Sequence, residues 1–162
     1  MNRLPQICLA IVTAVLVAVG VISVLQERSA APAAATVAEP AAAPVTGLDL
    51  VAAESPIGTV VTSGGKTLYR FEKDTPKPPK SNCAGKCAET WPPLLADGEP
   101  SVTGVDGALV GTVQRADGAA QVTLNGWPLY FFSGDSAPGD TKGEGVGGTW
   151  HAAGPDGKPA VK

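Results

Sequence analysis

The sequence predicts a mostly β fold: a compact domain of two degenerate β-meander repeats, preceded by one N-terminal transmembrane helix. One motif, G-x-x-L-Y-x-F-x-x-D, occurs at residues 65–74 and again at residues 126–135. Short apolar runs separated by Gly-Gly, Asp-Gly and Asn-Gly pairs surround both copies, which is typical of hairpins. Residues 7–25 contain no charged side chain, and a helix of that length nearly spans a hydrocarbon core of about 30 Å.

The apolar segment at residues 7–25 predicts an uncleaved membrane anchor, with residues 1–6 in the cytoplasm. The run is longer than the roughly 7–15 apolar residues of a secretory signal. Glu27 and Arg28 also follow it before any A-x-A cleavage pattern, such as Ala33-Ala34-Ala35. Cleavage after that pattern is the alternative. Arg3 favours a cytoplasmic N-terminus, so the rest of the chain is expected outside the bacterial plasma membrane.

Residues 26–47 predict a linker between the anchor and the domain. The segment is rich in alanine and proline, and Pro32, Pro40 and Pro44 interrupt any helix that alanine would favour. It contains too little apolar surface for a core, so we expect a semi-extended tether.

The extracytoplasmic tandem-repeat domain is expected at residues 48–162, with repeat 1 at about 57–95 and repeat 2 at about 109–158. Repeat 1 predicts strands at 58–62 and 67–71, joined by a turn at 63–65. Repeat 2 predicts strands at 111–115, 120–124 and 128–132, with turns at Asp117-Gly118 and Asn125-Gly126. Both turns read as type I′, in which both central residues have positive φ.

The motif tyrosines and phenylalanines are expected in the core. Side chains alternate along a strand, so Tyr69 and Phe71 share one face, as do Tyr130 and Phe132. An exposed aromatic platform for a ligand is the alternative. Two large aromatics outside the motif, Trp91 and Trp150, are expected to plug the ends of the two repeats, with ligand contact as their alternative role.

The motif aspartates, Asp74 and Asp135, follow their strands directly and predict Asx turns, in which the carboxylate accepts nearby backbone N–H groups. A ligand or catalytic role is the alternative. Asp135, Asp140 and Glu144 are weak candidates for a calcium site, because calcium needs six to eight oxygens. A solvated loop is the favoured interpretation, and no metal or other cofactor is predicted.

Cys83 and Cys87 are spaced C-x3-C, and outside the cytoplasm two such cysteines usually form a structural disulfide. A thiol-redox, metal or electron-transfer role for the pair is the alternative. The spacing matches neither a C-x-x-C redox site nor a C-x-x-C-H haem attachment. His151, the single histidine, would have to complete any soft-metal site with the two thiolates.

Composition argues against two classes of function. The formal net charge is −3, and the 12 lysines and arginines form no cluster, so nucleic-acid binding is not expected. The chain also lacks a nucleophile elbow, and its glycine-rich residues 139–148 lack the GK[ST] ending of a phosphate-binding loop. Catalysis is therefore not favoured.

Taken together, the doubled Y-x-F-x-x-D motif, residues 83–95 and residues 138–150 resemble the bacterial secreted-repeat family. Its members are described as predicted lipoproteins with a Y-x-[FWY]-x-x-D motif. The resemblance implies an envelope location and a tandem repeat but no agreed activity. Lipid attachment needs a cysteine just after the apolar segment, whereas Cys8 lies at its start, so anchoring by the helix is expected.

The expected function is that of a non-catalytic, membrane-tethered cell-envelope module that binds an envelope partner or a small ligand. The rival function is a redox or electron-transfer accessory that uses Cys83 and Cys87, and a third is a purely structural spacer.

Overall fold

The computed structural model describes residues 48–160, which contain eleven short strands. The predicted cytoplasmic segment 1–6, anchor 7–25 and linker 26–47 lie outside these residues. Within residues 48–160, no helix is both long and apolar enough to cross a membrane.

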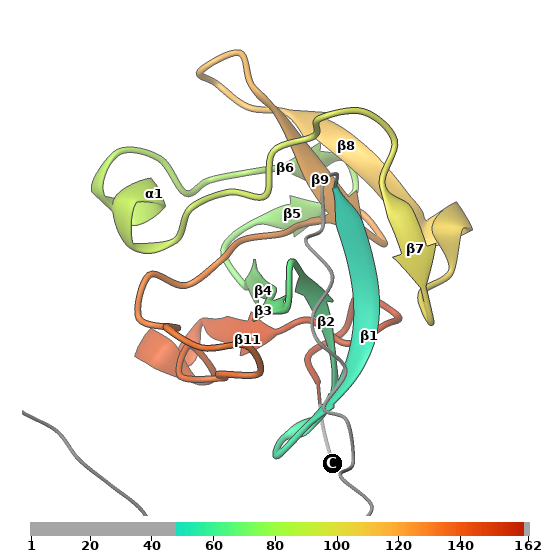
Figure 1. Ribbon diagram of the computed structural model, residues 1–162. Helices are drawn as coiled ribbons and strands as arrows, with labels where there is room; N and C mark the ends of the chain where they lie inside the picture. The colour runs from blue at the N-terminus through green and yellow to red at the C-terminus, as the bar shows by residue number, and fades with distance from the viewer. Residues whose placement is uncertain (1–47, 161–162) are drawn as a thin grey trace, which may run out of the picture. The chain divides into compact units, whose positions relative to one another are not determined.

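Two small sheets form the body of the domain (Figure 1). The first has the strand order β3-β2-β1-β7 and contains β1 (Asp49–Ser55), β2 (Gly58–Ser63), β3 (Lys66–Thr67) and β7 (Ser101–Thr103). Its pairs are antiparallel except for β1 with β7, which is parallel. The second has the order β10-β9-β8, all antiparallel, and contains β8 (Val110–Gln114), β9 (Ala120–Leu124) and β10 (Trp127–Pro128).

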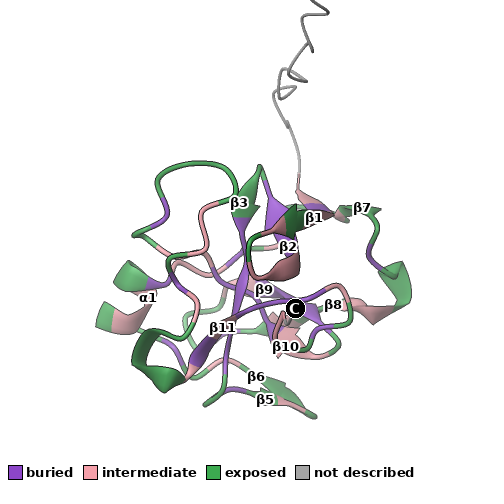
Figure 2. Cartoon of the chain, turned by 90° about the horizontal axis from the view of Figure 1, so that it is seen from below, coloured by how far each residue is buried: buried purple, intermediate pink, exposed green. Residues whose placement is uncertain are grey.

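Shorter elements complete the domain. Two more antiparallel pairs join β4 (Tyr69–Phe71) to β11 (Trp150–Ala152) and β5 (Thr75–Pro76) to β6 (Pro79–Lys80). The helical segments are α1 (Lys86–Thr90) and the 3-10 turns η1 (Gly107–Leu109) and η2 (Val146–Gly148). Figure 2 shows the buried segments running through the middle of the domain, with α1, β5 and β6 at its exposed rim.

The meanders differ from the sequence prediction in three places. In repeat 1 the structure adds β1, which the sequence analysis did not predict. The predicted strand 67–71 is divided between β3, which pairs with β2, and β4, which pairs with β11. In repeat 2 the predicted strand 128–132 leaves its sheet after Pro128, and Tyr130 then pairs with Tyr69 of the other repeat.

Only one of the two predicted type I′ turns has the expected backbone. Asn125 and Gly126 have φ values of 49° and 82°, which fit type I′. At the other turn only Gly118 has a positive φ, of 87°, and the Asp117 carboxylate accepts the Ala119 N–H. The five-residue loop between β8 and β9 allows this turn because it does not have to reverse the chain within two residues.

The two repeats are interlocked, since the last segment of each packs against strands of the other. The Val61 N–H in β2 donates to the carbonyl of Ala153, near the end of repeat 2, at 2.8 Å. In the same way, the Val122 N–H in β9 donates to the carbonyl of Leu94, near the end of repeat 1, at 2.8 Å. At the centre, Tyr69 and Tyr130 exchange backbone hydrogen bonds of 2.8 and 2.9 Å, so the repeats are related by an approximate two-fold axis.

The core falls into two clusters. The first is aliphatic and is built mainly from Leu50, Val61, Leu68, Leu124 and Leu129. The second is mostly aromatic and contains the motif tyrosines. Burying each of the large side chains contributes roughly 1.5–3 kcal/mol.

Candidate functional site

The motif tyrosines and aspartates form two hydrogen bonds that cross between the repeats. The Tyr69 hydroxyl donates to Asp135 Oδ2 at 2.7 Å, and the Tyr130 hydroxyl donates to Asp74 Oδ2 at 2.7 Å. Both tyrosines are fully buried, and both aspartates are 5% exposed or less. Each copy of the motif therefore supplies the acceptor for the tyrosine of the other copy.

The second oxygen of each aspartate holds a loop of its own repeat. Asp74 Oδ1 accepts the Asn82 N–H at 2.7 Å, eight residues along the chain, and Asp135 Oδ1 accepts the Lys142 N–H at 3.1 Å, seven residues along. An Asx turn would use an N–H only two residues away. The predicted Asx turns are therefore wrong, and the two carboxylates fix longer loops against the core.

Burial shifts the pKa values of Asp74 and of the two tyrosines. It raises the pKa of the Asp74 carboxyl above its ordinary value, although hydrogen bonds from Tyr130 and Asn82 and the charge of Arg115 lower it in part. Burial also raises the pKa values of the Tyr69 and Tyr130 hydroxyls. Both tyrosines therefore remain protonated donors at neutral pH.

Arg115 extends the network on one side, and the sequence analysis did not single it out. Its guanidinium is buried, with Nη1 donating to Ser81 Oγ at 2.8 Å and to Gln121 Oε1 at 2.6 Å. Its Nη2 donates to the Cys83 carbonyl at 2.9 Å. No sequence signal distinguishes this arginine, because these partners come from two separate segments, residues 81–83 and Gln121.

The aromatic side chains form one stacked column across the two-fold axis. The Trp91 and Trp150 rings stack with centroids 3.8 Å apart, Phe71 stacks on Trp150 at 4.2 Å, and Phe132 stacks on Trp91 at 4.4 Å. The prediction that the two tryptophans plug separate ends of the repeats is therefore wrong: they meet at the centre. Tyr69 and Tyr130 meet the column edge-on, at 5.4 Å from Trp91 and 5.2 Å from Trp150.

Cys83 and Cys87 are joined by a disulfide, as predicted, with Cα atoms 5.3 Å apart. Cys83 is buried in the aromatic cluster, and the Cys87 carbonyl accepts the Trp91 N–H at 2.8 Å. The bond thus lies at the start of α1, one turn before the tryptophan that enters the column.

The weak metal candidates Asp135, Asp140 and Glu144 are not brought together. Asp140 accepts from Lys142 Nζ at 2.8 Å, and Glu144 lies 2.9 Å from Nδ1 of His151 and accepts the Ala152 N–H at 2.7 Å. Asp135 accepts the hydrogen bond from the Tyr69 hydroxyl. Residues 48–160 contain no group of three or more His, Cys, Asp or Glu side chains that could hold a metal ion.

One end of the aromatic column reaches the surface at a hollow of about 340 Å³, which we call the phenylalanine hollow. It is lined by Lys66, Pro92, Phe131, Phe132, Ser133 and Asp135. Phe131 and Phe132 are half-buried, and Lys66 and Ser133 are exposed. The lining combines apolar side chains with an exposed cation, Lys66, and a buried carboxylate, Asp135.

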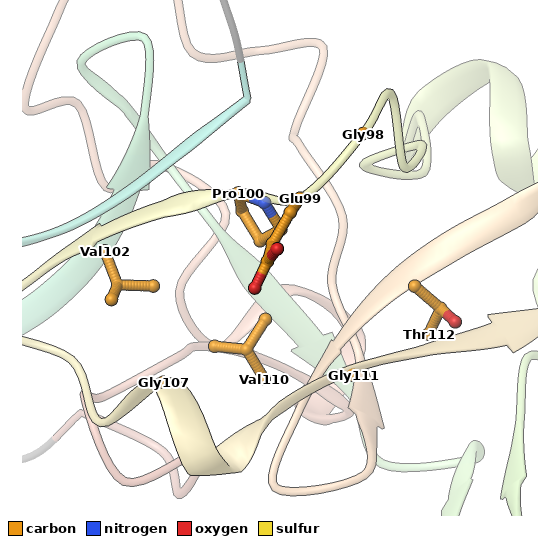
Figure 3. A pocket seen from close by; sticks show the side chains of 8 residues that line it. All are labelled: Gly98, Glu99, Pro100, Val102, Gly107, Val110, Gly111 and Thr112. Atoms are coloured by element: carbon orange, nitrogen blue, oxygen red, sulfur yellow. The ribbon is translucent and has the colours of Figure 1, made fainter.

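A second hollow, of about 300 Å³, lies beside β8, and we call it the β8 groove (Figure 3). The side chains of Glu99, Val102 and Val110 point into it, and Gly111 and Thr112 of β8 form one wall. None of the residues predicted as site residues lies in this groove.

Comparison with known proteins yields one match. A family model described as a secreted repeat of unknown function matches residues 51–95 and residues 111–154, which together make up more than half of the chain. No curated protein and no solved structure matches the chain.

Proposed function

Since the chain belongs to a family of secreted repeats of unknown function, we propose that it is a non-catalytic cell-envelope module that binds an envelope component outside the cytoplasm. Residues 7–25 anchor it in the bacterial plasma membrane as a single span, and residues 26–47 hold residues 48–162 away from the bilayer. This arrangement follows from the uncharged apolar segment and the Ala/Pro-rich stretch after it.

The observation that carries this proposal is that the motif side chains make their contacts inside the domain. The Tyr–Asp pairs bond to each other, the tryptophans stack, and the cysteines form a disulfide. The Y-x-F-x-x-D motif therefore holds the two repeats together. It leaves no motif carboxylate or hydroxyl free for acid–base chemistry.

Binding takes place at the phenylalanine hollow. Its floor of Pro92, Phe131 and Phe132 offers apolar and aromatic surface, and Lys66 supplies a positive charge at the rim. These features suit an envelope component that presents an apolar or ring face beside a negative group. Clustered apolar and aromatic surface rimmed by polar groups is characteristic of interaction sites.

Photo-crosslinking in intact cells tests the proposal. A photoreactive side chain replaces Ser133 in the full chain, and a second version replaces Lys80, which is exposed and lies outside the hollow. We expect one recurring adduct mass at position 133, its loss in Lys66→Glu, and no such adduct at position 80. No adduct at position 133, the same adducts at both positions, or insensitivity to Lys66→Glu would contradict the proposal.

A disulfide variant separates this function from the redox alternative. Cys83→Ala combined with Cys87→Ala removes a bridge that closes a short loop, which is worth roughly 2 kcal/mol. We expect a lower Tm and an unchanged adduct at position 133 below that Tm. Loss of the adduct while the near-UV spectrum stays native would favour a role for the cysteines in redox chemistry.

A further inference from the structure

The β8 groove runs along a sheet edge that no strand covers within residues 48–160. β8 is the terminal strand of its sheet. The Asn125 N–H bonds to the Leu109 carbonyl and the Arg115 N–H bonds to the Ala119 carbonyl, which fixes the alternation of backbone groups along β8. The Val110 carbonyl and the Thr112 N–H consequently point away from β9, toward the open edge.

The corresponding edge in the other repeat is covered. β1 begins the meander of repeat 1 as β8 begins that of repeat 2, and β7 lies along the outer edge of β1 in parallel. The Ser101 N–H bonds to the Leu48 carbonyl at 3.0 Å, and Val102 and Thr103 lie opposite Leu50 and Val51. The segment that precedes repeat 2 thus pairs with the first strand of repeat 1.

The sequence before repeat 1 contains a copy of this covering segment. Residues 102–106 read Val-Thr-Gly-Val-Asp and lead into β8, and residues 45–49 read Val-Thr-Gly-Leu-Asp and lead into β1. The fourth residues of the two copies, Val105 and Leu48, pack against the same aliphatic core cluster. Leu48, the described fourth residue of the first copy, therefore packs as Val105 does in the second copy.

We propose that Val45 and Thr46 form a short strand parallel to β8 and occupy the β8 groove. In this arrangement the Thr46 N–H donates to the Val110 carbonyl and the Thr112 N–H donates to the Thr46 carbonyl. Both bonds repeat the pattern of Thr103 on β1. The proposed strand completes the two-fold relation between the repeats, because each first strand is then covered by the segment that precedes the other repeat.

The chain can reach the groove from its described start. Leu48 is bonded to Ser101, and the neighbouring Pro100 lines the groove together with Gly111. The three residues 45–47 span about 10 Å when extended, which suffices to cross a groove of this size. The length of chain before Leu48 therefore supports the segment of the same chain as the proposed occupant.

The glycine in each copy of the segment, Gly47 or Gly104, allows close approach to the neighbouring strand. A Cβ on Gly104, the third residue of the other copy, would lie 2.9 Å from the Ala52 Cβ on β1, so that position needs glycine. Gly47 occupies the same place in its copy of the segment and would pass Thr112 of β8 at a similar distance. A covered edge would also protect β8 from pairing with other chains, since its residues Val110 to Gln114 include no charge or proline.

Amide hydrogen exchange on the full chain tests the proposal. Thr46→Pro removes the proposed donor and is compared with Thr36→Pro, a matched change further up the Ala/Pro-rich segment. We expect the Thr112 amide to exchange about tenfold faster or more in Thr46→Pro, as loss of a strand hydrogen bond implies. The amides of Gly111 and Val113, which face β9, and all amides in Thr36→Pro should be unchanged. A Thr112 amide that Thr46→Pro does not affect overturns the proposal.

A cysteine pair identifies the occupant independently of exchange. Val45 falls opposite Val110 in the proposed register, so Val45→Cys with Val110→Cys should form a disulfide in a Cys8→Ser background. The product should be a cross-linked monomer, whereas the Val37→Cys control with Val110→Cys should not cross-link. A cross-linked dimer would show that a second copy fills the groove, and absence of the bond would show that neither does; each result overturns the proposal as stated.

Discussion

At the residue scale, the motif aspartates are structural acceptors with unequal surroundings. Asp74 has the charge of Arg115 nearby, and its partner Tyr130 also bonds to Ser81 at 2.8 Å. The partner of Asp135, Tyr69, instead receives the backbone N–H of Gly143 at 3.2 Å. The two repeats thus keep the Tyr–Asp bond and differ in the groups that support it.

The raised pKa of Asp74 predicts how stability depends on pH. Because the folded pKa lies above the unfolded value, the folded state binds more protons between the two values, and stability falls as pH rises through that window. The free energy of unfolding of the wild type, relative to Asp74→Asn, should therefore decrease from about pH 4 upward. Urea denaturation across the acidic range measures this difference.

Asp117 provides the control with the opposite sign. Its pKa is lowered, mainly by the hydrogen bond from the Ala119 N–H, so its contribution is lost as pH falls through the folded value. The free energy of unfolding of the wild type, relative to that of Asp117→Asn, should then not decrease as pH rises. If Asp74→Asn has the same pH profile as the wild type, burial does not control the ionisation of Asp74.

At the element scale, turn chemistry predicted some strands and missed others. The Asn125-Gly126 turn located β9 correctly, because a tight turn with positive φ allows one register for the strands that follow. β1 was missed since its sequence, Asp-Leu-Val-Ala-Ala-Glu-Ser, has no alternation of apolar and polar residues. The strand pair β5–β6 was missed because its sequence is proline-rich and it covers a rim instead of the core.

Gly143 lies in the glycine-rich loop at 139–148. It is packed against the core, although the sequence suggested a solvated loop. A Cβ on Gly143 would lie 2.7 Å from the Tyr69 ring and 2.9 Å from Trp91. Gly143→Ala should therefore lower the free energy of unfolding by roughly 1–3 kcal/mol through overpacking. Chemical denaturation measures the change.

Gly107→Ala is the matched control for that substitution. A Cβ there would meet only Val102 Cγ2, at an ordinary contact distance of 3.6 Å, so the expected change is within about 0.5 kcal/mol. Equal effects of the two substitutions would mean that close approach to the Tyr69 ring is not what requires glycine at position 143.

At the scale of the whole molecule, the repeats form one folding unit. Each repeat donates its last segment to the other, and the aromatic column places one tryptophan from each repeat at the two-fold axis. Neither repeat encloses its own core. This arrangement differs from a chain of independent modules, in which each repeat contacts only its neighbours along the chain.

The interlocked arrangement predicts that the halves cannot fold separately. Residues 48–97 lack the acceptor of Tyr69, and residues 98–162 lack the acceptor of Tyr130. Each fragment alone should show no native near-UV signal from its tryptophans, and an equimolar mixture should regain it. The intact chain should unfold in one cooperative transition. A native-like spectrum from either fragment alone would contradict the interlocked fold.

The sequence by itself determined the duplication, the mostly β class, the disulfide and the membership of a secreted family, because each depends on local spacing or on matching residues. The anchor and linker remain predictions from composition. Only the tertiary structure decided which Tyr bonds to which Asp, where the tryptophans meet and what Arg115 holds. The Tyr–Asp bonds and the tryptophan stack join residues that lie far apart in the sequence. Because the two repeats are equivalent, the same sequence pattern would fit a tyrosine bonded to the aspartate of its own repeat or to that of the other repeat.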